Sequence, residues 1–199
     1  KEFLEEFGIE PYDEQSHKGL VRHLLIRNGY FTGQIMVCVI INGTKLPHQE
    51  EFIRRMCEIP GMTSISLNIN RERTNVIMGK QMVWLYGTPY IEDKIGDITY
   101  QISPLSFFQV NPLQTKKLYD TALSFAGLTG NETVWDLYCG IGTISLFLAR
   151  HAKMVYGVEI VEPAIQDAKK MHRQMGFPMC NSLWEKPRRF YQRSMRKKR

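Results

Sequence analysis

The sequence contains few cysteines and no long apolar run. Its 199 residues include four cysteines, and none forms a C-x-x-C pair. That scarcity argues against a zinc site or a disulfide scaffold and fits a reducing compartment. No apolar run approaches the length of a membrane span, and the first residues, Lys1 to Gly8, lack the apolar stretch of a signal peptide. We therefore expect a cytoplasmic globular protein that binds no membrane and no metal.

Basic charge is also scarce outside one end of the chain. The net charge of +6 suggests nucleic-acid binding. However, residues 170–199 contain ten Lys or Arg and one acid, whereas residues 1–169 contain 16 basic and 19 acidic residues. The basic excess therefore belongs to the tail. Such a tail either binds RNA non-specifically or is simply solvated.

Residues 1–105 are expected to form a central α+β domain with antiparallel strands. Asn28-Gly29 is a strong hairpin signal between two apolar runs. The amphipathic pattern at Pro47–Ile59 predicts a helix. The predicted strands are Leu20–Arg27, Phe31–Ile41, Ser64–Ile69, Val76–Met78, Met82–Tyr86 and Asp97–Ser103.

Residues 106–170 are expected to begin a second domain of Rossmann-like α/β type, with the boundary near Leu105. Asn111-Pro112 supplies a cap and a first helical residue for a helix that ends before Gly127. The segments that follow alternate in type, as in a doubly wound parallel sheet. They are a strand at Thr133–Tyr138, a helix at Thr143–His151, a strand at Met154–Val158 and a helix that begins in Glu162–Met175.

The stretch Asp136-Leu-Tyr-Cys-Gly-Ile-Gly-Thr143 lies between the first of these strands and its helix. Gly140 and Gly142 allow a tight turn and close approach of a ligand to the backbone. The third glycine of the dinucleotide fingerprint is missing. A methionine-type ligand has no pyrophosphate to seat there, so the pattern favours S-adenosylmethionine over a nicotinamide cofactor. The alternative interpretation is a purely structural turn.

Two acidic residues end the two apolar strands of this domain. Glu159 is placed to accept hydrogen bonds from both ribose hydroxyls of an adenosyl ligand. Asp136 is placed to meet the ligand's amino group, and Ile160 to press on the adenine. Strand, acid, two glycines, helix, strand and acid in this order predict a cofactor site.

The chain resembles the RNA uracil-5 methyltransferases at Phe107-Phe-Gln-Val-Asn111 and at Asp136-Leu-Tyr-Cys-Gly-Ile-Gly-Thr-Ile-Ser145, followed by Gly157-Val-Glu159. The resemblance is close over about residues 100 to 170. It implies S-adenosylmethionine as cofactor, contacted by Gln109, Tyr138 and Glu159, with Thr143 at a fourth position that some relatives fill with Asn. Simpler roles remain open: Gln109 as a capping or solvent-facing residue, and Tyr138 as a packing residue.

The resemblance also implies an RNA partner, with 23S rRNA preferred and tRNA open, and a monomeric intact enzyme. In this family a cysteine thiolate in an S-C-N-P-like motif adds to C6 of uracil, C5 then takes the methyl group, and a glutamate base removes the C5 proton. We find neither an S-C-N-P-like motif nor a counterpart of the base glutamate in these 199 residues. We therefore expect no catalytic residue in this chain, and no methyl transfer by the chain alone.

Residues 171–199 match no element of the family. Reading the codons one nucleotide back forces Ala, Gly, Val and Gly where the family has a helix end, an N-G turn and a third strand. We interpret this tail as a shifted reading frame, with a genuine disordered basic extension as the alternative.

Three other functions remain open on the sequence. They are a methyltransferase acting on a protein or small molecule, an inactive RNA-binding fragment, and a nicotinamide oxidoreductase. The F-x-Q-V-N element argues against another methyltransferase substrate, and the net acidic charge of residues 1–169 argues against an RNA-binding fragment. The missing third glycine argues against an oxidoreductase.

Overall fold

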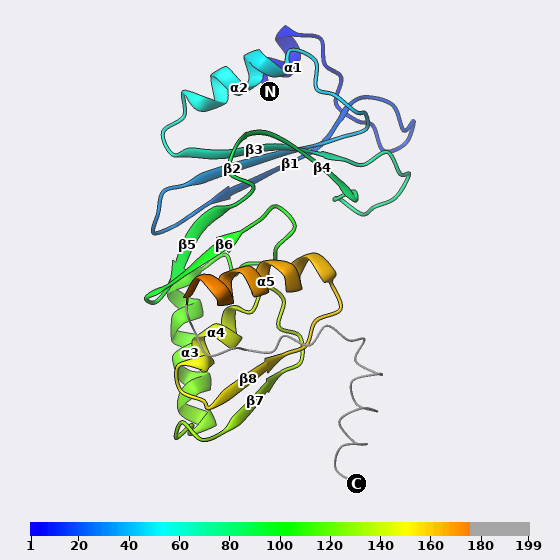
Figure 1. Cartoon of the computed structure of the whole chain (residues 1–199). Helices are drawn as coiled ribbons and strands as arrows, with labels where there is room; N and C mark the ends of the chain where they lie inside the picture. Colours follow the sequence, from blue (N-terminus) through cyan, green and yellow to red (C-terminus); the bar gives the residue numbers. More distant parts are fainter. Residues whose placement is uncertain (176–199) are drawn as a thin grey trace. The chain divides into compact units, whose positions relative to one another are not determined.

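The computed structural model describes residues 1–175 and divides the chain into two compact units between Asp93 and Lys94 (Figure 1). This division falls before the boundary expected near Leu105. The reason is that residues just after Lys94 pack with the second unit: the hydroxyl of Tyr100, for example, donates to the backbone oxygen of Thr143. The two units are described separately below.

The first unit is a four-stranded sheet in the order β1-β2-β3-β4. Its strands are β1 (Val21–Asn28), β2 (Ile35–Ile41), β3 (Met62–Ile69) and β4 (Gln81–Gly87). The β1–β2 and β3–β4 pairs are antiparallel, as expected, but β2 and β3 run parallel. The expectation of antiparallel pairing alone was wrong because α2 (Gln49–Cys57) connects β2 to β3 as a crossover.

Two helices cover one face of this sheet, α1 (Glu2–Glu6) and α2 (Figure 1). Phe3 and Phe52 project from them and meet edge to face, with ring centroids 5.2 Å apart. They pack on one row of strand side chains, since alternate residues of a strand share a face. The buried strand residues of this core are Val37, Val39, Ile41, Ile65 and Leu67.

The second unit contains the strand–helix–strand–helix pattern that the sequence predicts. Strands β7 (Thr133–Asp136) and β8 (Met154–Gly157) pair in parallel, and α4 (Thr143–Ala149) connects them. Helix α5 (Glu162–Met175) follows β8. A two-stranded sheet of β5 (Ile91–Ile95) and β6 (Ile98–Ile102) stands at the start of this unit.

Helix α3 (Pro112–Ala126) begins and ends as its sequence predicts. The side chain of Asn111 accepts a hydrogen bond from the backbone N–H of Gln114 at 3.0 Å and so satisfies one free donor of the first turn. Pro112 occupies the first helical position, and Gly127 ends the helix with a φ of 56°.

Two expectations for the first unit were wrong in detail. Val76–Met78 is not a strand but part of a loop. The connection after Asn28 is longer than a two-residue turn, because the N–H of Gly29 bonds the carbonyl of Gln34. None of the helices in the described part of the chain has the length and apolar character needed to cross a membrane. The shifted-frame interpretation concerns residues 171–199. Residues 171–175 continue α5, which ends at Met175, and residues 176–199 lie outside the described residues.

Candidate functional site

The glycine loop, residues 137–142, connects the carboxyl end of β7 to the first turn of α4. The N–H of Gly142 bonds the carbonyl of Cys139 at 2.7 Å, which closes a tight turn. Gly140 and Gly142 have φ values of 54° and 84°, in the left-handed region that side chains disfavour. A Cβ at Gly140 would meet no atom within 4 Å. The backbone therefore borders open space here, where a ligand can approach it.

Glu159 lies directly across from this loop. One carboxylate oxygen accepts a hydrogen bond from the N–H of Gly140 at 2.9 Å. The other accepts from the N–H groups of Ile160 at 2.7 Å and Val161 at 2.9 Å. Three backbone donors thus fix the orientation of the carboxylate. Since each carboxylate oxygen has two lone-pair sites, one site beside Gly140 remains available to a ligand hydroxyl.

Asp136 is the last residue of β7 and pairs in the register with Gly157, two residues before Glu159. Its carboxylate accepts a hydrogen bond from the hydroxyl of Ser145 at 2.6 Å. Burial raises the pKa of Asp136 above its ordinary value, against the lowering effect of Ser145, and the negative charge of Glu159 adds to the rise. The site therefore concentrates two carboxylates beside the N-terminus of α4. Such a group of charges is suited to a cationic ligand, which would relieve their repulsion.

Thr143 begins α4, and its polar atoms contact two buried tyrosines. The hydroxyl of Tyr119 lies 2.8 Å from the Thr143 hydroxyl, and the hydroxyl of Tyr100 donates to the Thr143 carbonyl at 3.0 Å. Burial raises the pKa of both tyrosines, so both remain protonated. These contacts hold the start of α4 to α3 and β6. The sequence analysis did not anticipate Tyr100, Tyr119 or Ser145, because no local pattern joins residues so far apart in the chain.

Three large side chains next to Glu159 or to the glycine turn in the chain are exposed. Tyr138 is 81% exposed, Ile160 57% and Val161 50%. Cys139, in contrast, is buried against Gly157, where a Cβ would lie 2.8 Å from the cysteine sulfur. The exposed aliphatic side chains of Ile160 and Val161, which follow Glu159 directly, offer apolar contacts to a base, and Cys139 serves packing.

Gln109 lies in the segment that leads into α3. It lines an open pocket of about 470 Å³, together with Val110, Asn111, Gln114, Thr115, Lys117, Leu118 and Thr121. Within the described residues, no hydrogen bond joins Gln109 to the glycine loop. The structure thus brings Asp136, Gly140 and Glu159 together and leaves Gln109 in a pocket formed with α3.

Two serines and an aspartate fix the turn just before Gln109. The hydroxyls of Ser103 and Ser106 lie 2.7 Å apart, and each donates to the Asp167 carboxylate at 3.1 Å. Asp167 belongs to α5, the helix after Glu159. This network therefore links the Gln109 segment to the helix that follows the second acidic strand end.

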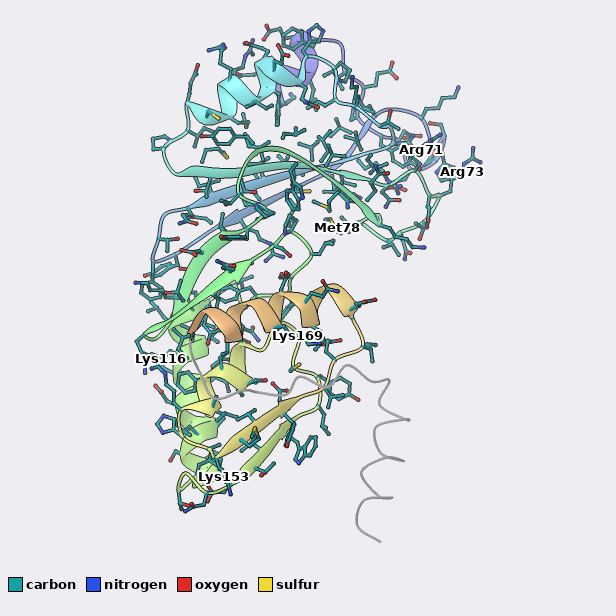
Figure 2. The ribbon with its side chains drawn as sticks, viewed as in Figure 1. Arg71, Arg73, Met78, Lys116, Lys153 and Lys169 are labelled. Atoms are coloured by element: carbon teal, nitrogen blue, oxygen red, sulfur yellow. The ribbon has the colours of Figure 1, made fainter. Side chains whose placement is uncertain are left out.

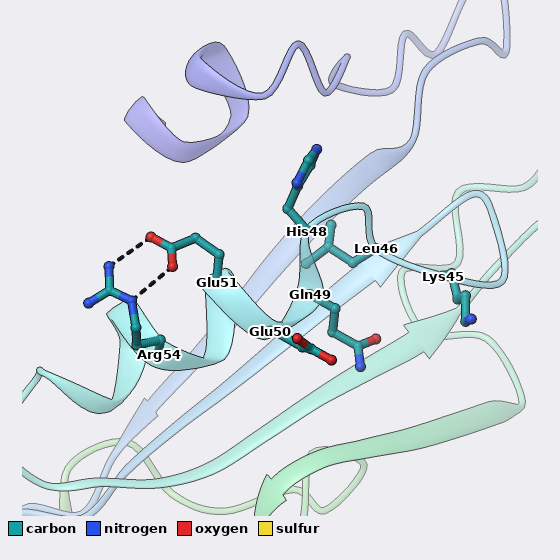
Figure 3. Close-up of a pocket in the computed structure, with 7 residues that line it drawn as sticks. All are labelled: Lys45, Leu46, His48, Gln49, Glu50, Glu51 and Arg54. Carbon is teal, nitrogen blue, oxygen red and sulfur yellow. Dashed lines mark hydrogen bonds and ion pairs between the residues drawn. The ribbon is translucent and has the colours of Figure 1, made fainter.

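A second pocket, of about 620 Å³, lies in the first unit at the start of α2 (Figure 3). Arg54 and Glu51 form an ion pair at 2.7 Å on its wall. Arg55 also bonds Glu51, and these arginines lower the pKa of that carboxyl to about 2. The charges of this pocket thus largely compensate one another, in contrast to the two carboxylates at the glycine loop.

A sequence model of the family described as tRNA (Uracil-5-)-methyltransferase matches residues 60–175. The chain belongs to this family. The match begins between α2 and β3, includes β3 and β4, and extends through the glycine loop to the end of α5. The resemblance inferred from Phe107–Asn111 and Asp136–Ser145 is thereby confirmed.

Curated relatives match most of this chain. An uncharacterized RNA methyltransferase of Halalkalibacterium halodurans is 57% identical over 178 residues, which are 89% of this chain and 39% of the relative. Another from Clostridium tetani is 50% identical over 175 residues, 87% of this chain and 38% of the relative. The chain thus spans about two fifths of the length of these relatives.

A solved structure of the same family shares the fold. The tRNA (uracil-54, C5)-methyltransferase of Pyrococcus abyssi, in complex with S-adenosyl-L-homocysteine, matches with a TM-score of 0.73 and 27% sequence identity. The match covers 89% of this chain and 42% of that structure. The β7–α4–β8–α5 segment is accordingly the start of a Rossmann-like domain, as its sequence predicts.

Proposed function

We propose that this uracil-5 methyltransferase transfers a methyl group from S-adenosylmethionine to C5 of uridine in RNA, and that this chain contributes the cofactor site. The observation that carries the proposal is the Glu159 carboxylate, held by the Gly140 N–H at 2.9 Å beside an open glycine loop. The uracil-5 methyltransferase of Pyrococcus abyssi, a relative with the same fold, was solved with S-adenosyl-L-homocysteine.

The residues present fit such a cofactor in shape and in charge. The space beside Gly140 is open, so a ligand can contact the backbone there. Glu159 has an acceptor site free for ribose hydroxyls, and the side chains of Tyr138 and Ile160 are exposed and accessible to a ligand. Asp136 supplies negative charge for the amino group of the methionine part. We include Gln109, Gly142 and Thr143 in the proposed binding set, with the Thr143 hydroxyl shared with Tyr119.

When bound, S-adenosylmethionine supplies an electrophilic methyl group on a sulfonium. The role of this chain is to position that group. Glu159 is already oriented by three backbone donors, so little order has to be created on binding. Asp136 and Glu159 give the site a negative charge, which suits the positively charged amino and sulfonium groups of the cofactor.

We propose 23S rRNA as the substrate, on the resemblance to the rRNA branch of the family. A tRNA substrate is the second candidate, which the names of the matching family and of the Pyrococcus abyssi relative favour. The intact protein is proposed to work in the cytoplasm as a monomer. No S-C-N-P sequence occurs in the 199 residues, and we propose that the nucleophilic cysteine and the base glutamate belong to another part of the intact protein. We therefore propose that the chain alone does not methylate RNA.

Mass spectrometry of 5-methyluridine tests this proposal in cells. Deletion of the gene is expected to abolish 5-methyluridine at one site of 23S rRNA and to leave tRNA unchanged. Loss confined to tRNA would support the second candidate. Unchanged 5-methyluridine in both RNAs would overturn the proposal.

A further inference from the structure

A buried arginine donates hydrogen bonds to the backbone of one loop of the first unit. We call residues 71–80, between β3 and β4, the arginine loop. The side chain of Arg22 is only 1% exposed. Its guanidinium donates to the carbonyls of Asn70 at 3.0 Å, Glu72 at 2.7 Å and Thr74 at 2.9 Å. A buried charged group therefore fixes the first half of the loop, with Tyr12 stacked 4.4 Å from the guanidinium.

Two buried asparagines fix the second half. The amide of Asn70 donates to the carbonyls of Val76 at 2.7 Å and Ile77 at 3.0 Å. The amide of Asn68 donates to the carbonyl of Gly79 at 2.9 Å, and its oxygen accepts from the Gly79 N–H. Because these side chains belong to the end of β3 and the residue after it, the loop keeps its shape without a ligand. Five carbonyl oxygens of the loop thus accept hydrogen bonds from buried side chains: those of Glu72, Thr74, Val76, Ile77 and Gly79.

The outer side of the loop is basic, unlike the rest of its unit. Arg71 and Arg73 are exposed and project from the loop (Figure 2), and neither forms an ion pair with another residue in the described part of the chain. Residues 71–80 contain three basic residues and one acid, Glu72. The remainder of residues 1–93 contains seven basic and 11 acidic residues. The basic charge is thus a local feature of this loop.

Apolar side chains lie beside these arginines in the same loop. Val76 is 57% exposed and Ile77 51%. Guanidinium groups bind phosphates through paired N–H donors and also stack on bases. Exposed aliphatic groups can contact sugars and base faces. Carbonyl oxygens that are already bonded to buried side chains add no repulsion toward a polyanion.

We propose that the arginine loop is an RNA-binding surface, with Arg71 and Arg73 contacting phosphates. The proposal rests on the proposed function, because an RNA methyltransferase must hold its substrate by groups other than the cofactor site. The buried hydrogen bonds of Arg22 and Asn70 serve to present the two guanidinium groups in a fixed arrangement, which lowers the entropy lost on binding.

The test is fluorescence anisotropy of an unmodified, uridine-containing RNA transcript with the 199-residue chain over a range of salt concentrations. The double variant R71Q/R73Q is compared with the matched control K94Q/K153Q, which removes two exposed positive charges from the second unit. All three proteins retain the basic residues 170–199, so non-specific binding by that tail is common to them. We expect R71Q/R73Q to bind about tenfold more weakly at low salt, with the salt slope reduced by about 1.4, as two lost phosphate contacts on a single strand imply.

Several results would overturn the proposal. These are wild-type affinity in R71Q/R73Q, an equal loss in K94Q/K153Q, no RNA binding by the wild-type chain, or competition by polyglutamate as effective as by RNA. Binding of S-adenosyl-L-homocysteine to the same variants separates this proposal from the proposed function. A failure of the cofactor site would abolish that binding in every protein, whereas a failure of the RNA surface would leave it intact.

Discussion

The carboxylate of Glu159 accepts a hydrogen bond from the Gly140 N–H at 2.9 Å, although 19 positions separate the two residues in the chain. The parallel pairing of β7 and β8 explains this meeting, because Asp136 and Gly157 are partners in the register and both strands end at one edge. The same edge carries the glycine loop and the start of α4. Ligands of open α/β sheets bind outside such carboxyl ends.

Replacing Glu159 is expected to weaken cofactor binding strongly. In Glu159→Gln, one carboxylate oxygen becomes an NH₂ group that faces backbone donors at Gly140 or Ile160. Hydrogen bonds to charged groups contribute about 1.5–3 kcal/mol, so S-adenosyl-L-homocysteine should bind about 10- to 100-fold more weakly by calorimetry. The control is Glu162→Gln, an exposed acid at the start of α5. Equal affinities of the two variants would count against a role for Glu159.

Cofactor binding is expected to fall in acid because of Asp136. Burial raises the pKa of this carboxyl, so it loses its charge at a higher pH than an ordinary aspartate. Ser145→Ala removes a hydrogen bond that lowers the pKa, and it should therefore move the acid limb of binding to still higher pH. Asp136→Asn should bind the cofactor weakly, and its binding should not decrease further in acid. A binding profile that is identical in wild type and Ser145→Ala would contradict this assignment.

Asp136 also links stability to pH, with a defined sign. A carboxyl whose pKa is higher in the folded than in the unfolded state binds protons more readily when folded. The free energy of unfolding therefore decreases as pH rises through this pKa. Asp136→Asn removes the buried charge and should be more stable than wild type at neutral pH while binding the cofactor less well. Urea denaturation at neutral and acidic pH measures this, and reduced stability of Asp136→Asn at neutral pH would show that the charge is not costly.

Gly157 is expected to be intolerant of a side chain because of Cys139. A Cβ at Gly157 would lie 2.8 Å from the cysteine sulfur and 3.2 Å from its Cβ. Gly157→Ala should reduce the free energy of unfolding by about 1–3 kcal/mol, measured by urea denaturation. The sulfur is the closest atom, so the double variant Gly157→Ala with Cys139→Ala should recover part of the loss. Strictly additive losses would exclude this contact as the cause.

Much of the second unit could be predicted from its sequence because its signals are local. Asn111, Pro112 and Gly127 bound α3 through contacts within a few residues. The first unit was harder. Val76–Met78 has an apolar pattern, yet its carbonyls bond the distant side chain of Asn70, so no strand forms. Strand β5 was missed because three consecutive charged residues, Glu92 to Lys94, stand between its two isoleucines.

The candidate site shows the same limit. The acids and glycines follow from spacing along the chain, and the structure brings Asp136, Gly140 and Glu159 to one edge. The residues that hold them do not follow from spacing. Ser145 bonds Asp136, and Tyr119 bonds Thr143 from another helix. Such partners are fixed only when the chain has folded, since they depend on the packing of α3 against α4.

The loss of Asp167 is expected to loosen the segment before Gln109. Its carboxylate accepts hydrogen bonds from Ser103 and Ser106, so Asp167→Ala leaves Ser106, which is 2% exposed, without that acceptor. A reduction of about 1–2 kcal/mol in the free energy of unfolding is expected. Asp167→Asn, which keeps an acceptor oxygen, should lose less. Hydrogen exchange at Phe107–Gln109 should accelerate in Asp167→Ala, and unchanged exchange there would contradict the anchoring role.

The most direct test of the cofactor site is a titration of the isotopically labelled chain with S-adenosyl-L-homocysteine, followed by amide resonances. We expect saturable shifts at Gly140, Gly142 and Ile160, and their loss in Glu159→Ala. Shifts confined to other places, such as the pocket around Lys45 and Arg54, or no shifts at any concentration, would contradict a cofactor site at the glycine loop.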